Sequence, residues 1–330
     1  MKRIVMGLSF VLLVAAASLL PGRAQNTANA TANPSEQPPT HNWAAGNPLK
    51  IALLKWYRAN TTTHFAVGSQ PYGVAFDGAN IWTANFGDAT VTKLRANDGE
   101  VLGTFKVGGE AYGVTFDGAN IWVSSVEDST VTKLRASDGK LLSTYEVGTI
   151  QGWMTFDGAN IWVPHGKNTV TKLRASDGKN LGNFTVGNSP IMTAFDGANV
   201  WTTNTGDGTV TKLRASDGKV LGTFKVGSRP FGMAFDGVNV WVANDYDATV
   251  SKLRASDGKV MGTFTTGLGP YGVVFDGTSM WVTTGEGVWQ LRLTDGVRLC
   301  EVPNHGSSGA AFDGANIWVT EFNGNVVGKL

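Results

Sequence analysis

The sequence is poor in cysteine, in charge and in long apolar segments. Cys300 is the only cysteine in 330 residues, so no internal disulfide can form and packing has to supply the stability. Charged residues make up 16% of the chain and the formal net charge is +1, without a basic stripe, which excludes nucleic acid as an expected partner. The sequence contains no phosphate loop, dinucleotide fingerprint or haem-attachment motif, so those cofactors are not expected.

The one long apolar run lies at the N-terminus. It follows Lys2 and Arg3, spans residues 4–20 and is followed by small residues that end at Ala24. A run this short and rich in alanine is typical of a secretory signal peptide, so residues 1–24 are predicted to be cleaved. The mature chain is then secreted or periplasmic and has no membrane span. An uncleaved N-terminal anchor is the alternative.

Two further segments come before the main body of the chain. Residues 25–47 consist largely of Asn, Thr, Ala, Pro and Gln, and are predicted to be a disordered linker because they cannot bury enough apolar surface to fold. Residues 48–60 are predicted to form a short helix, since Pro48 suits a first helical position and Leu49 and Leu53 share one helical face. An extra strand is the alternative for this segment.

From residue 61 onward the sequence is built from a repeated unit. The phrase Phe-Asp-Gly-Ala-Asn-Ile-Trp recurs seven times with small changes, and its phenylalanines lie 40, 40, 39, 40, 40 and 37 residues apart. These anchoring residues are Phe76, Phe116, Phe156, Phe195, Phe235, Phe275 and Phe312. A fixed period near 40 indicates a repeat architecture in which each unit buries its apolar face against its neighbours.

Each unit reads as four short strands. Runs of β-branched and aromatic residues alternate with Asp-Gly pairs, which supply the positive φ that tight hairpin turns need. Four antiparallel strands per 40 residues is the unit of a propeller blade. We therefore predict an all-β fold over residues 61–330, a seven-bladed β-propeller of four-stranded antiparallel blades in which the recurring Trp packs between blades. The charges of the recurring Lys-Leu-Arg-Ala-Ser-Asp-Gly-Lys segments are interpreted as surface pairs.

Strand counting predicts how the ring closes. The sequence has seven Phe-Asp-Gly hairpins and seven third strands, but only six fourth strands follow them. Residues 62–68 match the fourth strand at residues 102–108 in register. The N-terminal strand is therefore predicted to complete the last blade, so that the ring has no unpaired inner edge.

The position of the turns predicts where a binding site would lie. Both Asp-Gly turns of a blade fall on one rim, here called the bottom rim. The connectors between blades and the loops between second and third strands fall on the other, the top rim. The bottom turns hardly change between units, whereas the top loops differ in nearly every unit. An asymmetric site is therefore expected at the top rim and the mouth of the central channel.

Two sets of side chains are candidates for ligand binding there. The aromatic set at the top of the innermost strands either plugs the channel or stacks on a ligand: Tyr72, Tyr112, Trp153, Phe231 and Tyr271. The polar set stands three residues after each recurring Trp and is predicted to face the upper channel: Asn85, His165, Asn204, Asn244 and Glu321. Asp245 is a further candidate on the same rim. One histidine and one carboxylate fall short of a metal site, so no metal or other cofactor is expected.

Two resemblances to known families follow from these motifs. The pattern Gly-x-x-Phe-Asp-Gly-Ala-Asn-Ile-Trp-Val, followed by Thr-Val-Thr-Lys-Leu, resembles exported bacterial propellers of the YVTN and NHL-like group, often binding scaffolds. The last unit, from Ile317 to Leu330, is similar to a repeat of the streptogramin (virginiamycin B) lyases. Those are seven-bladed propellers that open a cyclic depsipeptide by elimination, with a His base and a magnesium ion held by carboxylates. Glu321 matches a metal carboxylate of that pattern, while Ser308 stands where the family has its His and His305 lies three residues earlier.

Two classes of function remain at the level of sequence. The first is a non-enzymatic secreted or periplasmic scaffold, expected to be monomeric, that binds a protein, peptide or glycan across its top rim. The second is a carbon–oxygen lyase of the streptogramin type, or a hydrolase, with Mg²⁺ or Ca²⁺ at the channel mouth. Under that alternative the catalytic candidates are His305, Glu321 and His165.

Overall fold

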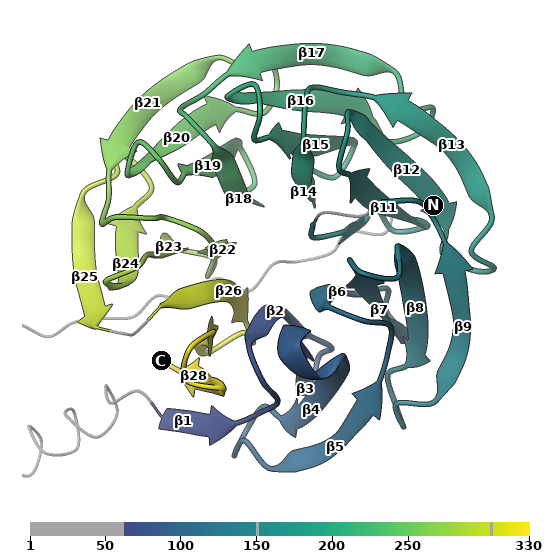
Figure 1. Ribbon diagram of the computed structural model, residues 1–330. Coiled ribbons are helices and arrows are strands. Elements are labelled where there is room, and N and C mark those ends of the chain that lie inside the picture. Colours follow the sequence, from purple (N-terminus) through teal and green to yellow (C-terminus); the bar gives the residue numbers. More distant parts are fainter. Residues whose placement is uncertain (1–62, 150–151, 304–305) are drawn as a thin grey trace, which may run out of the picture. The chain divides into compact units, whose positions relative to one another are not determined.

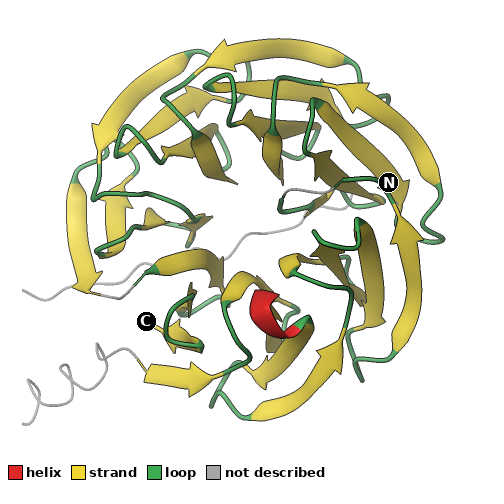
Figure 2. Ribbon diagram, in the orientation of Figure 1, coloured by secondary structure: helices red, strands yellow, loops and turns green. Residues whose placement is uncertain are grey.

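The computed structural model describes residues 63–149, 152–303 and 306–330. The predicted signal peptide, linker and segment 48–60 lie outside these residues. The described residues form seven four-stranded antiparallel sheets arranged as a ring, so the chain is a seven-bladed β-propeller as predicted (Figure 1). Nearly all of the regular structure is strand (Figure 2). In the described ranges no helix has the length and apolar character needed to cross a membrane, and the one helical turn is η1 (Phe86–Asp88).

The blades follow one another along the chain. Blade 1 contains β2 (Pro71–Phe76), β3 (Asn80–Asn85), β4 (Thr90–Arg95) and β5 (Val101–Lys106); blade 2 contains β6 (Ala111–Phe116), β7 (Asn120–Ser125), β8 (Thr130–Arg135) and β9 (Leu141–Glu146). Blade 3 contains β10 (Thr155–Phe156), β11 (Asn160–His165), β12 (Thr169–Arg174) and β13 (Asn180–Thr185); blade 4 contains β14 (Pro190–Phe195), β15 (Asn199–Asn204), β16 (Thr209–Arg214) and β17 (Val220–Lys225).

Blade 5 contains β18 (Pro230–Phe235), β19 (Asn239–Asn244), β20 (Thr249–Arg254) and β21 (Val260–Thr265); blade 6 contains β22 (Val273–Phe275), β23 (Ser279–Thr283), β24 (Gly287–Arg292) and β25 (Arg298–Pro303). Blade 7 contains β26 (Ser307–Phe312), β27 (Ile317–Glu321), β28 (Val326–Lys329) and, as its outer strand, β1 (Thr63–Ala66).

The recurring phrase is explained by hydrogen bonds to its aspartate. In blade 2, Asp117 Oδ1 accepts from the backbone N–H of Asn120 at 2.7 Å, and Asp117 Oδ2 accepts from Trp122 Nε1 at 2.7 Å. The carboxylate thus holds the hairpin turn and satisfies the indole of a tryptophan that is fully buried. Gly118 follows with a φ of +95°, which a glycine adopts without strain. These contacts explain why the Asp, the Gly and the Trp of the phrase recur in every blade.

Neighbouring blades are joined by the recurring Trp and the Lys of the Lys-Leu-Arg segment. Trp82 packs with Ile121 and Leu134 of the next blade. Lys93 Nζ lies 5.1 Å from the centre of the Trp82 ring and donates to the carbonyl of Ala136 in the next blade at 2.7 Å. Six lysines do this: Lys93, Lys133, Lys172, Lys212, Lys252 and Lys329.

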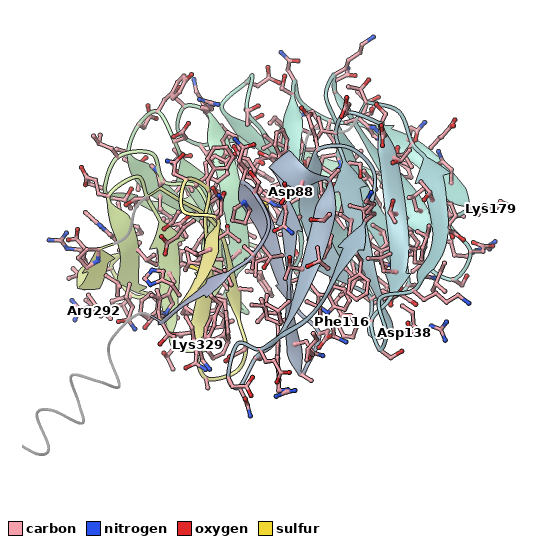
Figure 3. The ribbon with its side chains drawn as sticks, turned by 60° about the horizontal axis from the view of Figure 1, so that its bottom comes forward. Asp88, Phe116, Asp138, Lys179, Arg292 and Lys329 are labelled. Carbon is pink, nitrogen blue, oxygen red and sulfur yellow. The ribbon has the colours of Figure 1, made fainter. Side chains whose placement is uncertain are left out.

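The interpretation of these segments as surface charge is therefore right for the arginines and for the lysine that ends each segment, but wrong for the lysine that begins it. Arg214 and Asp217 form an exposed ion pair, with the Arg214 Nη2–Asp217 Oδ2 distance at 2.7 Å. Lys93 is only 6% exposed, because the hydrophobic stem follows the Trp face and the ammonium group reaches the carbonyls of the next blade. Figure 3 shows Lys329 and Asp138 near the bottom ends of the strands, and Asp88 at the top.

In blades 1 to 6, the second Asp-Gly turn packs against the preceding blade. Gly139 has a φ of +73°, and a Cβ atom there would lie 2.1 Å from the ring of Phe105. Gly99 has the same relation to Phe65, at 2.0 Å. These turns therefore need glycine twice over, for the backbone angle and for the close approach of an aromatic ring.

The ring closes as the strand count predicted. β1 pairs with β28 in antiparallel register, with Phe65 opposite Val327. Phe65 stacks on Trp318 with ring centres 5.5 Å apart, and the backbone N–H of Gln70 donates to Asn325 Oδ1 at 2.9 Å. Segments from the two ends of the repeat region thus share one sheet, and the last blade has no unpaired third strand.

Candidate functional site

Aromatic side chains from several blades meet at the channel mouth. Tyr112 of blade 2 and Tyr271 of blade 6 lie across the ring from each other, and their hydroxyl oxygens are 2.8 Å apart. Tyr72 stacks on Tyr112 with ring centres 4.7 Å apart, and Trp153 meets Tyr271 edge to face at 5.4 Å. We call this cluster the aromatic plug: Tyr72, Phe86, Tyr112, Trp153, Phe231, Tyr271 and Phe322.

The phenols of the plug are neutral donors and acceptors. Burial raises the pKa of Tyr112 and of Tyr271 well above the ordinary value for tyrosine, and burial raises that of Tyr72 as well. A phenol with a raised pKa is not a base at neutral pH. The plug can therefore offer hydroxyl hydrogen bonds and ring faces to a ligand above it, but no negative charge.

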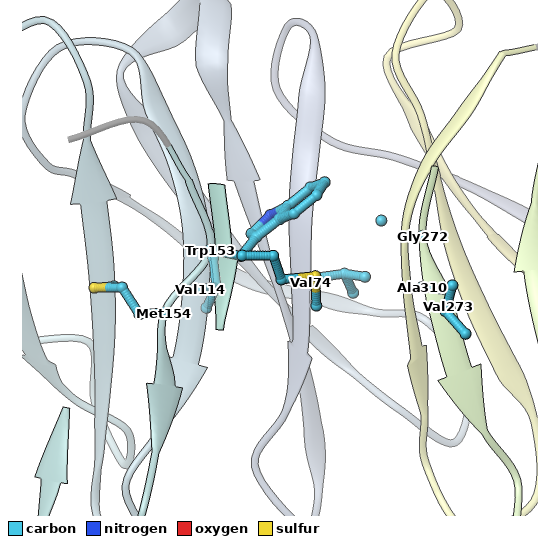
Figure 4. A pocket seen from close by; sticks show the side chains of 9 residues that line it. Val74, Val114, Trp153, Met154, Gly272, Val273 and Ala310 are labelled. Carbon is cyan, nitrogen blue, oxygen red and sulfur yellow. The ribbon is translucent and has the colours of Figure 1, made fainter. Parts of the chain in front are cut away.

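A small apolar cavity lies below the plug. It has a volume of about 80 Å³, and its walls include Val74, Val114 and Val273 from innermost strands and Met154, which directly precedes β10. Trp153 projects across one side of this space (Figure 4). The cavity is too small for a depsipeptide or a sugar, so neither ligand fits inside it.

The polar set predicted to face the upper channel lies elsewhere. In blade 1, Asn85 Nδ2 donates to Thr92 Oγ1 at 2.9 Å, and the hydroxyls of Thr92 and Thr104 are 3.4 Å apart. Asn204 and Asn244 form the same contact in their blades. We call this row of three positions, from the second strand to the outer strand, the cross-strand row. Its residues share the sheet face turned to the preceding blade, so their side chains run along the sheet instead of into the channel.

His165 begins the cross-strand row of blade 3. His165 Nε2 lies 2.5 Å from Thr171 Oγ1, which donates to Asn183 Oδ1 at 2.6 Å. Burial lowers the pKa of His165 and outweighs the backbone hydrogen bonds at Gly148 and Thr149. The imidazole is therefore neutral at pH 7. It lines a groove on the top rim and not the channel mouth.

Glu321 begins the cross-strand row of blade 7, and its partner is a residue that the sequence analysis missed. Glu321 Oε1 lies 2.7 Å from Nε2 of His64, which stands on β1 at the outer end of the row. The Glu321 side chain is 7% exposed and that of His64 is 46% exposed. The signal was present, because the predicted register places His64 where Thr104 stands in blade 1. His305 lies outside the described residues.

Asp245 forms an ion pair with a second residue that sequence analysis missed. Asp245 Oδ2 lies 3.1 Å from Arg229 Nη1, and burial raises the pKa of Asp245 although the Arg229 charge opposes this. The Arg229 guanidinium also stacks on Tyr246 at 4.7 Å and on Phe231, a plug residue, at 5.2 Å. Tyr246 is 70% exposed, and Leu268 on the adjacent connector is 67% exposed. We call Arg229, Asp245, Tyr246 and Leu268 the blade 5 patch.

The described residues do not gather metal ligands. Within residues 63–149, 152–303 and 306–330, no three His, Cys, Asp or Glu side chains come together as a metal-binding group. His165, Asp245 and Glu321 lie in blades 3, 5 and 7, and each has its own hydrogen-bonding or ionic partner. A hard cation would need several oxygen ligands at one point, which these three do not supply.

The fold and the site define a seven-bladed propeller with a closed channel and an asymmetric top rim. No family model and no curated protein matches the chain. Among solved structures, the chain is similar to a hydrazine synthase from Kuenenia stuttgartiensis, with 16% identity, a TM-score of 0.69, and coverage of 81% of this chain and 96% of that one. It is also similar to a streptogramin B lyase, with 17% identity, a TM-score of 0.68, and coverage of 82% and 96%. At these identities the likeness shows the propeller fold alone.

Proposed function

We propose that this protein is a secreted or periplasmic propeller that binds a protein, peptide or glycan ligand across its top rim, with the aromatic plug as the floor of the site. The observation that carries the proposal is the blade 5 patch beside the plug. Its members have the composition of a binding hot spot, since Tyr and Arg are enriched at interface centres. The site has an apolar floor, exposed Tyr246 and Leu268, and an Arg229 already held by Asp245.

The geometry favours a peptide segment of the ligand over a glycan. Arg229 is oriented by two aromatic rings and by one carboxylate, so little side-chain entropy is lost when it forms a further hydrogen bond. Leu268 adds an aliphatic surface, which suits an apolar side chain of a peptide. An extended segment could then lie from the blade 5 patch onto the plug.

The experiment is a selection of displayed peptides and a glycan array, both probed with the purified mature chain. Ligands enriched by the wild type should be lost with Tyr246→Ala combined with Leu268→Ser. They should be retained with Val238→Ser, which removes a side chain that is 65% exposed on the bottom rim. Equal binding by all three proteins would place recognition away from the blade 5 patch and refute the proposal.

The lyase alternative draws on the fold likeness to a streptogramin B lyase, which shows the propeller fold alone. No contact among the described residues favours it, because His165 and Glu321 are engaged in different blades and Glu321 is paired with His64. A thermal-shift titration with Mg²⁺ and Ca²⁺ separates the two, since an ion that binds only the folded chain raises its melting temperature. The scaffold proposal expects no such shift.

A further inference from the structure

Among the described residues, four blades hold their entering connector with an aspartate. In blade 1, Asp88 Oδ2 accepts from the backbone N–H of Ser69 at 2.5 Å. The same bond, 19 residues apart in each case, joins Asp128 to Gly109, Asp207 to Asn188 and Asp247 to Ser228. We call this contact the carboxylate clamp. It shows that the connector amide at this place on the top rim is built to receive a carboxylate.

Blade 3 has a lysine where the clamp aspartate stands. The backbone carbonyl of Asn168 accepts from Val186, just as that of Ala89 accepts from Val107, which aligns the two loops. The residue before that carbonyl is Asp88 in blade 1 and Lys167 in blade 3. A negative side chain is thus replaced by a positive one, at an exposed position on the rim.

The groove beside Lys167 also differs from its counterparts. It has a volume of about 260 Å³, and its lining includes Thr149, His165, Lys167 and Thr169 but no acidic side chain. The corresponding groove of blade 2 is lined by Asp128. The groove between blades 4 and 5 is lined by Asp207 and Asp247. Of these three grooves, the one in blade 3 therefore has the donors of an anion site without the internal carboxylate.

We propose that the blade 3 groove binds a carboxylate group of a ligand, in the place that a clamp aspartate fills in blades 1, 2, 4 and 5. Lys167 supplies the charge, and the hydroxyls of Thr149 and Thr169 supply donors. His165 forms the floor, held by Thr171. The carboxylate comes from a small organic acid or from the C-terminus of a peptide. This inference deepens the proposed function by naming a chemical group that one sector of the top rim recognises.

The test is a titration of the full mature chain followed by NMR at the His165 ring resonance, which is assigned with His165→Gln. The probes are acetate, N-acetylglycine and the uncharged N-acetylglycinamide. A saturable shift with the two acids and none with the amide is expected, because only a carboxylate satisfies the groove. Tighter binding of N-acetylglycine than of acetate points to a peptide C-terminus as the source, and equal binding to a small acid.

The key variant is Lys167→Asp, which introduces the residue that forms the clamp in blades 1, 2, 4 and 5 and should fold at least as well as the wild type. Its affinity for acetate and N-acetylglycine should fall about tenfold or more, since a charged donor becomes an acceptor that occupies the groove. Lys140→Asp makes the same charge change on the bottom rim and should bind like the wild type. Equal binding by the two variants, or an equal response to the amide, overturns the inference.

The outcome is separable from that of the proposed function. Tyr246→Ala with Leu268→Ser leaves the blade 3 groove intact, so it should bind acetate normally while losing the selected peptides. Lys167→Asp leaves the blade 5 patch intact. If acetate fails to bind and the peptides still do, the carboxylate inference alone is wrong.

Discussion

The junction between blades makes a quantitative prediction for Lys93→Met. The substitution keeps most of the apolar stem but removes the ammonium group that bonds to Ala136 at 2.7 Å and to Ser137 at 3.1 Å. A hydrogen bond to a charged group contributes about 1.5–3 kcal/mol, and a desolvated cation–π contact about 2 kcal/mol. Removing the cost of burying the charge offsets part of this loss. The net loss of unfolding free energy should be about 2–3 kcal/mol.

The assay is urea unfolding with linear extrapolation, supported by calorimetry. At roughly 2–4 °C per kcal/mol for a domain of about this size, the melting temperature should fall by about 5–10 °C. Lys140→Met is the matched control, because Lys140 is exposed at the adjacent turn and its side chain bonds to nothing in the next blade. If Lys93→Met is as stable as Lys140→Met, the buried lysines do not join the blades and the reasoning is wrong.

Three further predictions test the turns, the aspartates and the closing blade. Gly99→Ala should destabilise the fold by about 3 kcal/mol or more, and Gly78→Ala by about 1–2 kcal/mol. Both glycines have a positive φ, but only Gly99 lies against an aromatic ring. Urea unfolding of the two variants tests this difference. Burial raises the pKa of Asp117, but the hydrogen bonds from its turn and from its Trp outweigh burial, so the net pKa is lowered. The stability that the Asp117 carboxylate contributes should therefore be complete above about pH 4 and be lost as the pH falls below this value. Melting temperatures that stay constant as the pH falls below about 4 would contradict this prediction. His64→Ala leaves the buried Glu321 without its partner and should cost about 1–2 kcal/mol, and adding Glu321→Gln, which removes the uncompensated charge, should recover part of that loss in the same assay.

The fold could be predicted from the sequence because the repeat itself encodes it. The period near 40 predicts the blade, and the Asp-Gly pairs predict the turns. The match between residues 62–68 and 102–108 predicts the closing strand, which is β1 and pairs with β28. Strands and tight turns restrict the residue types within their own short segments, so these patterns are visible in the sequence. The buried lysines were missed because a charged residue in a strand is ordinarily exposed, and only the packed neighbour reveals its carbonyl partners.

The candidate site was less predictable, for a geometric reason. The aromatic residues at the channel mouth could be predicted because every innermost strand lines the central channel, and Tyr72, Tyr112 and Tyr271 stand at equivalent positions near its top end. The polar set lies one strand further out, where the choice of face follows from strand register. One residue of register turns a side chain from the channel to the neighbouring blade. Asn85 is on the interblade face, and sequence spacing alone did not fix this.

Closure of the ring explains some of the positions at which a blade departs from the repeat. Gln290 stands where other blades have the junction lysine. In blade 7 no hairpin turn joins the third strand to β1, so the carbonyls that such a lysine would reach are not presented there. Glu321 and His64 also lie in the closing blade, where the outer strand comes from the opposite end of the repeat region and need not keep the residues of the others.

Lys167 has no such explanation. Blade 3 has all four strands in sequence order and a complete blade on each side, so nothing in the closure asks for a change there. An aspartate at this position would hold the connector at no cost to the strands, as it does in four other blades. With Lys167 in place of this aspartate and His165 at the start of the cross-strand row, blade 3 loses the clamp contact. The lining of its groove then contains no acidic side chain. A carboxylate supplied by a ligand accounts for both changes with a single cause.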